Sequence, residues 1–203
     1  MIRRILDSGI RFLRGLARPT KAANTRLLTA RGESPASFVI RTATAADVPA
    51  LARLHVETFV QTHGGPGPSY EIRERQWRAM FAGNDGSWFC LVIERPAGGL
   101  VGFAKGEPYT DELPGFAGEL NKLYLLRDYQ RLGLGRRLVG HVARRFLSQG
   151  ISSMLLFGEA RNPSNGFYEA LGAERLITPT GEFHGGYGWR DLQALAAACD
   201  QLT

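Results

Sequence analysis

Apolar residues recur along this chain at two spacings, and each spacing predicts a different kind of element. Apolar positions three or four residues apart predict a helix with one apolar face, whereas alternating or continuous apolar runs predict strands. Helical spacing covers residues 45–63, 71–83, 134–148, 163–172 and 192–202. Strand-like runs cover residues 38–44, 87–94, 100–109, 116–126, 151–160 and, as a closing pair, 173–192. Asp47 is expected to cap the first of these helices, and residues 95–99 to join two strands into a hairpin.

The start of the chain has a helical pattern of its own. Over residues 2–18 apolar side chains fall on one face and arginines on the other, and Pro19 ends the pattern. Three interpretations remain open: docking on a membrane surface or a partner, an organelle transit peptide, or packing on the chain's own domain or on a second copy in a homodimer. Thr20 to Ser37 lacks periodicity and is interpreted as a linker. We therefore divide the chain into an extension, 1–37, and a domain, 38–203, and expect a protein beginning near Ser37 to keep the domain's chemistry.

The net charge of +6 comes entirely from the first part of this 203-residue chain. Residues 1–36 hold eight Lys or Arg against Asp7 and Glu33, whereas residues 37–203 hold seventeen charges of each sign. Binding to nucleic acid needs a basic face, so the neutral domain argues against a nucleic-acid partner. No apolar run reaches the roughly 18 residues that a membrane span requires.

The cysteines and histidines predict neither a disulfide framework nor a metal site. Cys90 and Cys199 are the only cysteines and lie far apart, and His55 and His63 have no third ligand nearby in the sequence. Free cysteines favour a reducing compartment, so we expect a cytoplasmic protein. Cys90 stands in an apolar run and is expected in the core, and the three tryptophans are expected in the core or lining a groove.

The stretch QRLGLGRRL, residues 130–138, predicts a site for an anion. Gly133 and Gly135 lack a Cβ and can adopt positive φ angles that turn successive N–H groups inward. The helix that begins there adds N–H groups without partners inside the helix. Three arginines supply positive charge: Arg131, Arg136 and Arg137. The stretch matches neither the P-loop of nucleotide-binding proteins nor the three-glycine dinucleotide fingerprint.

Three local patterns and the order of elements resemble the GNAT superfamily of acetyltransferases over about residues 38–191. The turn matches the family's Q/R-x-x-G-x-G/A, the strand ELNKLYLL precedes it, and NPSNGFYEALGA is similar to a third family segment. The resemblance implies that acetyl-CoA binds with its pyrophosphate on the turn and its pantetheine arm along the strand. The residues so implied are Leu123, Tyr124, Leu125, Gln130, Arg131, Leu132, Gly133, Leu134, Gly135, Arg136 and Asn162. Asn162 departs from the pattern, since it stands six positions before Tyr168 where many members have seven.

The same resemblance implies the fold and the catalytic groups. The fold is an α/β domain with a mixed, mostly antiparallel sheet flanked by helices, in which a splayed parallel strand pair holds acetyl-CoA. Glu119 on the cofactor strand is the candidate base, with a solvent-facing strand residue as the alternative interpretation. Tyr168 is the candidate acid that protonates the thiolate, with aromatic packing as its alternative. Backbone N–H groups near Leu123 to Leu125 are expected to polarise the thioester carbonyl.

We therefore expect an acetyl-CoA-dependent N-acetyltransferase without a metal. Its acceptor is a primary amine of a small molecule or a protein, attacked directly, and the neutral domain argues weakly against a polycationic acceptor. The loop THGGPGPSY, residues 62–70, lies where GNAT folds gate the acceptor cleft. The alternative is a CoA-binding regulatory or interaction module that has lost catalysis.

Overall fold

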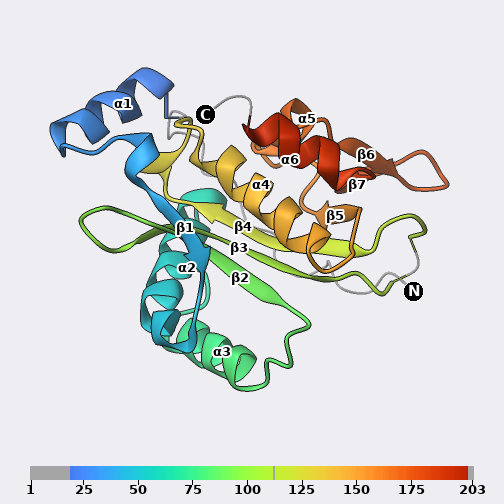
Figure 1. Ribbon diagram of the computed structural model, residues 1–203, viewed down its shortest axis with the longest axis horizontal. Coiled ribbons are helices and arrows are strands. Elements are labelled where there is room, and N and C mark those ends of the chain that lie inside the picture. The colour runs from blue at the N-terminus through green and yellow to red at the C-terminus, as the bar shows by residue number, and fades with distance from the viewer. Residues whose placement is uncertain (1–18, 112, 201–203) are drawn as a thin grey trace.

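A single sheet organises the domain. The computed structural model describes residues 19–111 and 113–200, and within them seven strands form one sheet in the order β1-β2-β3-β4-β5-β7-β6 (Figure 1). The strands are β1 Val39–Thr42, β2 Phe89–Glu94, β3 Leu100–Pro108, β4 Gly118–Leu125, β5 Met154–Phe157, β6 Glu174–Ile177 and β7 Phe183–Trp189. Every neighbouring pair is antiparallel except β4 and β5. The predicted fold class is confirmed.

Helices cover both faces of this sheet. They are α1 Lys21–Ala30, α2 Val48–His63, α3 Tyr70–Ala82, α4 Leu134–Leu147, α5 Asn165–Ala170 and α6 Leu192–Asp200, with short 3₁₀ turns η1 Pro35–Ser37, η2 Ala45–Asp47 and η3 Arg127–Tyr129. In Figure 1, α4 and α6 lie on one side of the sheet and α2 and α3 on the other. The core is accordingly divided in two, one part beneath α4 and one beneath α2 and α3. None of the described helices is long and apolar enough to cross a bilayer.

The expectations for the interior are confirmed at several positions. Trp77 and Trp189 are buried, and Cys90 is 1% exposed. Burial raises the pKa of the Cys90 thiol to about 12. A thiol at that pKa forms almost no thiolate at neutral pH, so Cys90 serves packing and not nucleophilic chemistry.

The segment from Thr20 to Ser37, which was interpreted as a linker, contains the helix α1. Thr20 caps α1, since its hydroxyl accepts a hydrogen bond from Ala23 N at 3.1 Å, and Leu28 is buried in the core beneath α4. The helix is short and largely polar, and tertiary contacts at a few positions stabilise it where periodicity gives no signal. The predicted helix over residues 2–18 lies outside the described residues.

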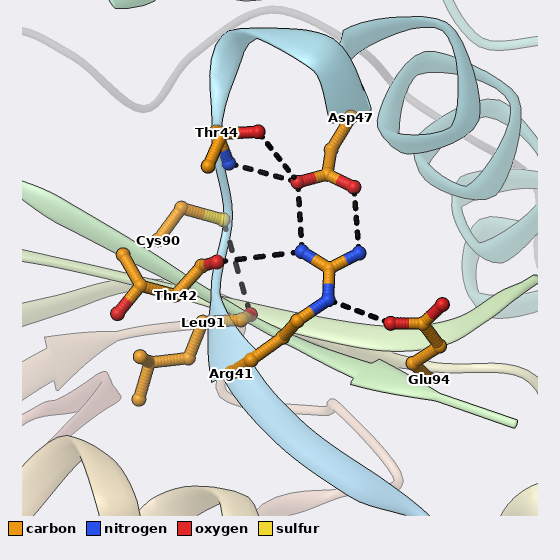
Figure 2. Close-up of polar contacts among 7 residues, drawn as sticks. All are labelled: Arg41, Thr42, Thr44, Asp47, Cys90, Leu91 and Glu94. Atoms are coloured by element: carbon orange, nitrogen blue, oxygen red, sulfur yellow. Dashed lines mark hydrogen bonds and ion pairs between the residues drawn. The ribbon is translucent and has the colours of Figure 1, made fainter.

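Asp47 has a different role from the one expected. It precedes α2, yet its carboxylate makes no capping bond to that helix. It accepts instead from Arg41 Nη1 at 2.9 Å and Nη2 at 2.8 Å, and from Thr44 N at 2.8 Å (Figure 2). Arg41 Nε also donates to Glu94 at 2.6 Å. The hydrogen bonds from Arg41 lower the pKa of Asp47. The η2 turn brings the Asp47 carboxylate back toward β1, so this bidentate pair fixes the corner between β1 and α2.

Candidate active site

The parallel strands β4 and β5 separate soon after they meet. Only Gly118 with Met154 and Glu119 with Leu155 are paired, although β4 continues to Leu125. Leu126 N donates to Val101 O at 2.9 Å. Because backbone groups alternate along an antiparallel strand, Leu123 and Leu125 direct their main-chain groups to the opposite edge, into the split.

Tyr124 differs from its two neighbours. Its main chain pairs with Phe103 on β3, so a main-chain bond from Tyr124 to a cofactor in the split is not available. The Tyr124 side chain points to the face covered by α2 and α3, where its ring stacks on Phe103 with 5.3 Å between centroids. Any role of Tyr124 in the site therefore belongs to its phenol.

The turn that follows β4 is open to an anion. Arg131 has a φ of 63° and Gly133 a φ of 83°, both in the left-handed region. A Cβ added at Gly133 would meet nothing within 4 Å. Within the described chain, the backbone N–H groups of residues 131–136 donate to no protein acceptor, and the first turn of α4 holds no acidic residue. Such a cradle fits a phosphate group; contact with the cofactor remains a prediction.

Several side chains of this turn serve the fold. Gln130 Nε2 donates to Leu125 O at 2.9 Å, which closes the turn onto the end of β4. Leu132 and Leu134 are buried, so these residues offer a ligand only their main chain. Arg137 was expected to add charge at the turn, but its guanidinium donates to Pro35 O at 2.6 Å and Phe38 O at 3.0 Å. Arg131 is exposed and Arg136 is half-buried.

Helix α1 braces the turn from outside. Asn24 is 5% exposed, and its Nδ2 donates to Arg127 O and to Gln130 O, both at 2.8 Å. Arg31 Nη1 donates to the Tyr129 hydroxyl at 2.8 Å. These bonds fix the backbone just before the anion cradle. Sequence reasoning missed Asn24, because one asparagine in a polar segment gives no pattern that marks it as buried.

Tyr168 lies on α5 among aromatic rings. It is 9% exposed, with Tyr187 at 5.5 Å and Trp189 at 6.3 Å between centroids. Burial raises the pKa of its phenol to about 12, and the neighbouring Tyr124 and Tyr187 act in the same direction. Aromatic packing and proton donation, the two interpretations of Tyr168, therefore do not exclude each other. Asn162 Oδ1 accepts from Ser164 N at 2.8 Å, which shapes the loop before α5.

Glu119 stands where β4 and β5 meet. Its Cα partners are Glu107 on β3 and Leu155 on β5, and its Oε1 accepts from Asn121 Nδ2 at 3.3 Å. Burial raises the pKa of Glu119, and the charge of Glu107 adds to that rise, whereas Asn121 and Lys105 oppose it. A half-buried carboxylate with a raised pKa is suited to accept a proton.

A β-bulge places further groups beside Glu119. Lys105 pairs with Lys122 but Gly106 pairs with Leu120, so Asn121 is an extra residue in β4. This irregularity is a β-bulge. As a result Lys122 and Tyr124 lie on the same face as Glu119, although they are three and five positions away.

The face beneath α2 and α3 holds polar atoms that lack partners. His55 is 3% exposed and contacts the rings of Phe103 and Tyr124, each 5.2 Å away between centroids. Burial lowers the pKa of His55 to about 3, with smaller effects from Arg73 and Lys122. Three buried nitrogens have no hydrogen-bond partner among the described residues: His55 Nδ1, Arg73 Nε and Trp77 Nε1. No group of His, Cys, Asp and Glu in the described chain is arranged to hold a metal ion.

Comparison with known proteins identifies the family. The model of the acetyltransferase (GNAT) family matches residues 48–173. The uncharacterized N-acetyltransferase YuaI of Bacillus subtilis is 32% identical over 169 residues, which cover 77% of this chain and 95% of YuaI.

Solved structures share the fold at lower identity. The PaiA N-acetyltransferase of Thermoplasma acidophilum, solved in complex with coenzyme A, aligns with a TM-score of 0.56 at 20% identity over 75% of this chain and 98% of its own. The ribosomal-protein-alanine N-acetyltransferase of Brucella melitensis aligns with a TM-score of 0.56 at 23% identity over 74% and 98%. The family match and the 32% identity to YuaI, with the splayed sheet and the open turn, establish that this chain belongs to the GNAT family and is an acetyltransferase.

Proposed function

We propose that this enzyme transfers the acetyl group of acetyl-CoA to a primary amine by direct attack. The observation that carries the proposal is the run of free backbone N–H groups over residues 131–136, directly after the strand edge that leaves β5. Those N–H groups and the positive end of the α4 dipole would stabilise a pyrophosphate. The open edge of β4 at Leu123 and Leu125 would hydrogen-bond an extended pantetheine chain, as an added strand does.

The reaction forms a bond from the amine nitrogen to the thioester carbonyl carbon and breaks the carbon–sulfur bond. A protonated amine has no free electron pair, so it must first lose a proton, and we assign that proton to Glu119, directly or through one water. The raised pKa of Glu119 makes it a stronger base than an exposed glutamate. The main-chain N–H groups in the split stabilise the negative charge on the carbonyl oxygen.

The departing thiolate takes a proton, which we assign to Tyr168. A phenol with a pKa of about 12 stays protonated throughout the neutral range, so the donor is always ready. The acceptor is a small-molecule amine or a protein amino group, and the name N-acetyltransferase carried by YuaI supports a nitrogen acceptor. The remaining predicted contacts, from Arg131, Arg136 and Asn162, belong to the cofactor side of this proposal.

The substitution Gly135→Asp tests the cofactor site. A Cβ at Gly135 would lie 3.5 Å from Phe167 Cζ, an ordinary contact, so the fold should be kept. The carboxylate would repel a pyrophosphate, and we expect affinity for acetyl-CoA to fall by at least about 100-fold, because a like charge at close range costs several kcal/mol. Titration calorimetry measures the affinity, and circular dichroism checks the fold.

Gly83→Asp is the matched control. Its added Cβ would also have its nearest neighbour at 3.5 Å, the Ala79 O atom, and it lies at the end of α3 on the other face of the sheet (Figure 1). This variant should bind acetyl-CoA like the wild type. Near-normal affinity in Gly135→Asp would show that the turn does not hold the cofactor.

A further inference from the structure

Two cations on the face beneath α2 and α3, Arg73 and Lys122, form no ion pair with a carboxylate of the described chain. Lys105 and Lys122 are cross-strand neighbours, and Lys105 forms an ion pair with Glu107. Lys122 Nζ donates only to the amide oxygen of Asn121, at 2.7 Å. Arg73 Nη1 donates to Gln76 Oε1 at 3.1 Å, and its Nε is buried without a partner. Within residues 19–111 and 113–200 neither Lys122 nor Arg73 forms an ion pair.

Both cations are partly removed from water. The Arg73 guanidinium lies over the Phe59 ring, 5.7 Å from its centroid. Burial lowers the pKa of Arg73. Burial also lowers the pKa of Lys122, where Lys105 and Arg73 add to the effect and the charges of Glu107 and Glu119 oppose it. A half-buried cation without a counterion is unfavourable in the free protein. An anionic ligand would remove that penalty.

Arg73 acts on the phenol of Tyr124. Burial raises the pKa of Tyr124, and the charge of Arg73 opposes that rise. Tyr124 in turn affects the pKa of Tyr168, the candidate acid, after the larger effect of burial. Arg73 therefore lies near the part of the molecule where the acetyl group would be transferred, and Lys122 lies on the same face of β4 as Tyr124.

Carboxylates stand next to these cations on the same face. Glu119 and Glu107 are Cα partners two pairs along the β3–β4 ladder from Lys105 and Lys122. Glu159, on the loop after β5, lies 3.9 Å from His63 Nδ1 and also affects Tyr124. The face thus offers negative charge near the candidate base and positive charge beside it. This pattern is complementary to a molecule that carries an ammonium and an anionic group close together.

We infer that the acceptor is a small amine that also carries a carboxylate, held by Arg73 and Lys122 while its amino group faces Glu119. Arg73 supplies a fork of N–H donors suited to a carboxylate, and Lys122 supplies a point charge. The inference rests on the proposed function, since it names the acceptor for that same transfer.

A set of paired acceptors tests this inference. Each amino acid is compared with the amine that lacks its carboxylate and with the corresponding aminophosphonate; the amino acids are phenylalanine, leucine and methionine. The assay follows release of the coenzyme A thiol. We expect kcat/KM for at least one amino acid to exceed that of its decarboxylated amine by about 10- to 100-fold, the value of a hydrogen bond to a charged group. The aminophosphonates report whether any anion suffices or a carboxylate is required.

Arg73→Gln should remove this preference. Its KM for the amino acid should rise by about 10- to 100-fold, a larger change than that for the decarboxylated amine. Its circular dichroism spectrum should match that of the wild type, which shows that the variant is folded. Arg75→Gln, an exposed arginine on the same helix, is the control and should behave as the wild type.

The outcomes separate the two proposals. Equal turnover of amino acids and decarboxylated amines would overturn the acceptor inference and leave the proposed transfer intact. Binding of acetyl-CoA without acetylation of any member would overturn the inference and count against the proposed transfer as well. An unchanged preference in Arg73→Gln would overturn the role of Arg73.

Discussion

The two sides of the split between β4 and β5 are built from different groups. On the side of α4 the side chains of Gln130 and Arg137 are already bonded within the protein, and the backbone N–H groups of residues 131–136 are free. On the side of α2 and α3 the free groups are side chains, among them His55, Arg73 and Trp77. Backbone donors persist through most substitutions, whereas side-chain donors change with each one. A site made of backbone suits a ligand common to a family, and a site made of side chains suits a ligand particular to one member.

Tyr168→Phe gives the largest expected effect, because our proposal assigns the proton of the departing thiolate to Tyr168, which lies in the core beneath α4. The change keeps the ring that packs on Tyr187 and Trp189 and removes only the hydroxyl. We expect kcat to fall by about 10²–10⁴-fold, as for a lost general acid, with acetyl-CoA affinity unchanged. Steady-state kinetics and calorimetry measure both quantities. Tyr187→Phe, which loses a hydroxyl bonded to Glu169, is the control; equal kinetics in the two variants would assign Tyr168 to packing alone.

Asn24→Leu tests whether the turn at residues 131–136, the cofactor site of our proposal, depends on α1. The change leaves the carbonyls of Arg127 and Gln130 without their donor. We expect a loss of about 2 kcal/mol in unfolding free energy and about tenfold weaker binding of acetyl-CoA, with KM for the acceptor unchanged. Denaturant unfolding and calorimetry measure these effects. If acetyl-CoA affinity and KM for the acceptor changed by the same factor, the separation of the two sides would be contradicted.

The brace also changes the expectation for a shortened chain. Removal of residues 1–36 was expected to spare the domain's chemistry, but it would delete Asn24 and the buried Leu28. A chain beginning at Pro19 keeps α1 and is the appropriate form in which to examine what residues 2–18 do, including the proposed contact with a membrane surface or a second subunit.

His55→Leu gives the smallest effect and concerns the acceptor side. Burial lowers the pKa of His55 to about 3, below its ordinary value of 6.5, so below about pH 6.5 the unfolded chain binds a proton that the folded chain excludes. Stability is fully present above that pH and is lost as the pH falls; at pH 5.5 the loss is about 1 kcal/mol. The leucine variant should lack this loss. Parallel pH dependence in both proteins, followed by denaturant unfolding, would show that His55 is not the group that titrates.

The open turn after β4 was largely predictable from sequence, whereas the buried polar groups beneath α2 and α3 were not. Gly133 and Gly135 stand at the start of a helix with one apolar face. Because these residues are close together in the chain, the pattern can be recognised from one sequence without the fold. Arg73 stands on a helix with several exposed charges, and only the fold shows that its Nε is buried. Asn24 was missed for the same reason, since its two acceptors are 103 and 106 residues away.

The extra residue at Asn121 has an evolutionary consequence. Side chains along a strand alternate between two faces, so a strand normally shows one face only positions of equal parity. The insertion changes the parity midway, and β4 can present Glu119, Lys122 and Tyr124 to one side. Because the bulge absorbs the extra residue, a relative that lacks it would keep the pairing with β3 on both sides, and its counterparts of Lys122 and Tyr124 would face the same side. In an alignment such a relative would show a one-residue gap in β4 between two segments whose side chains keep their places in the sheet.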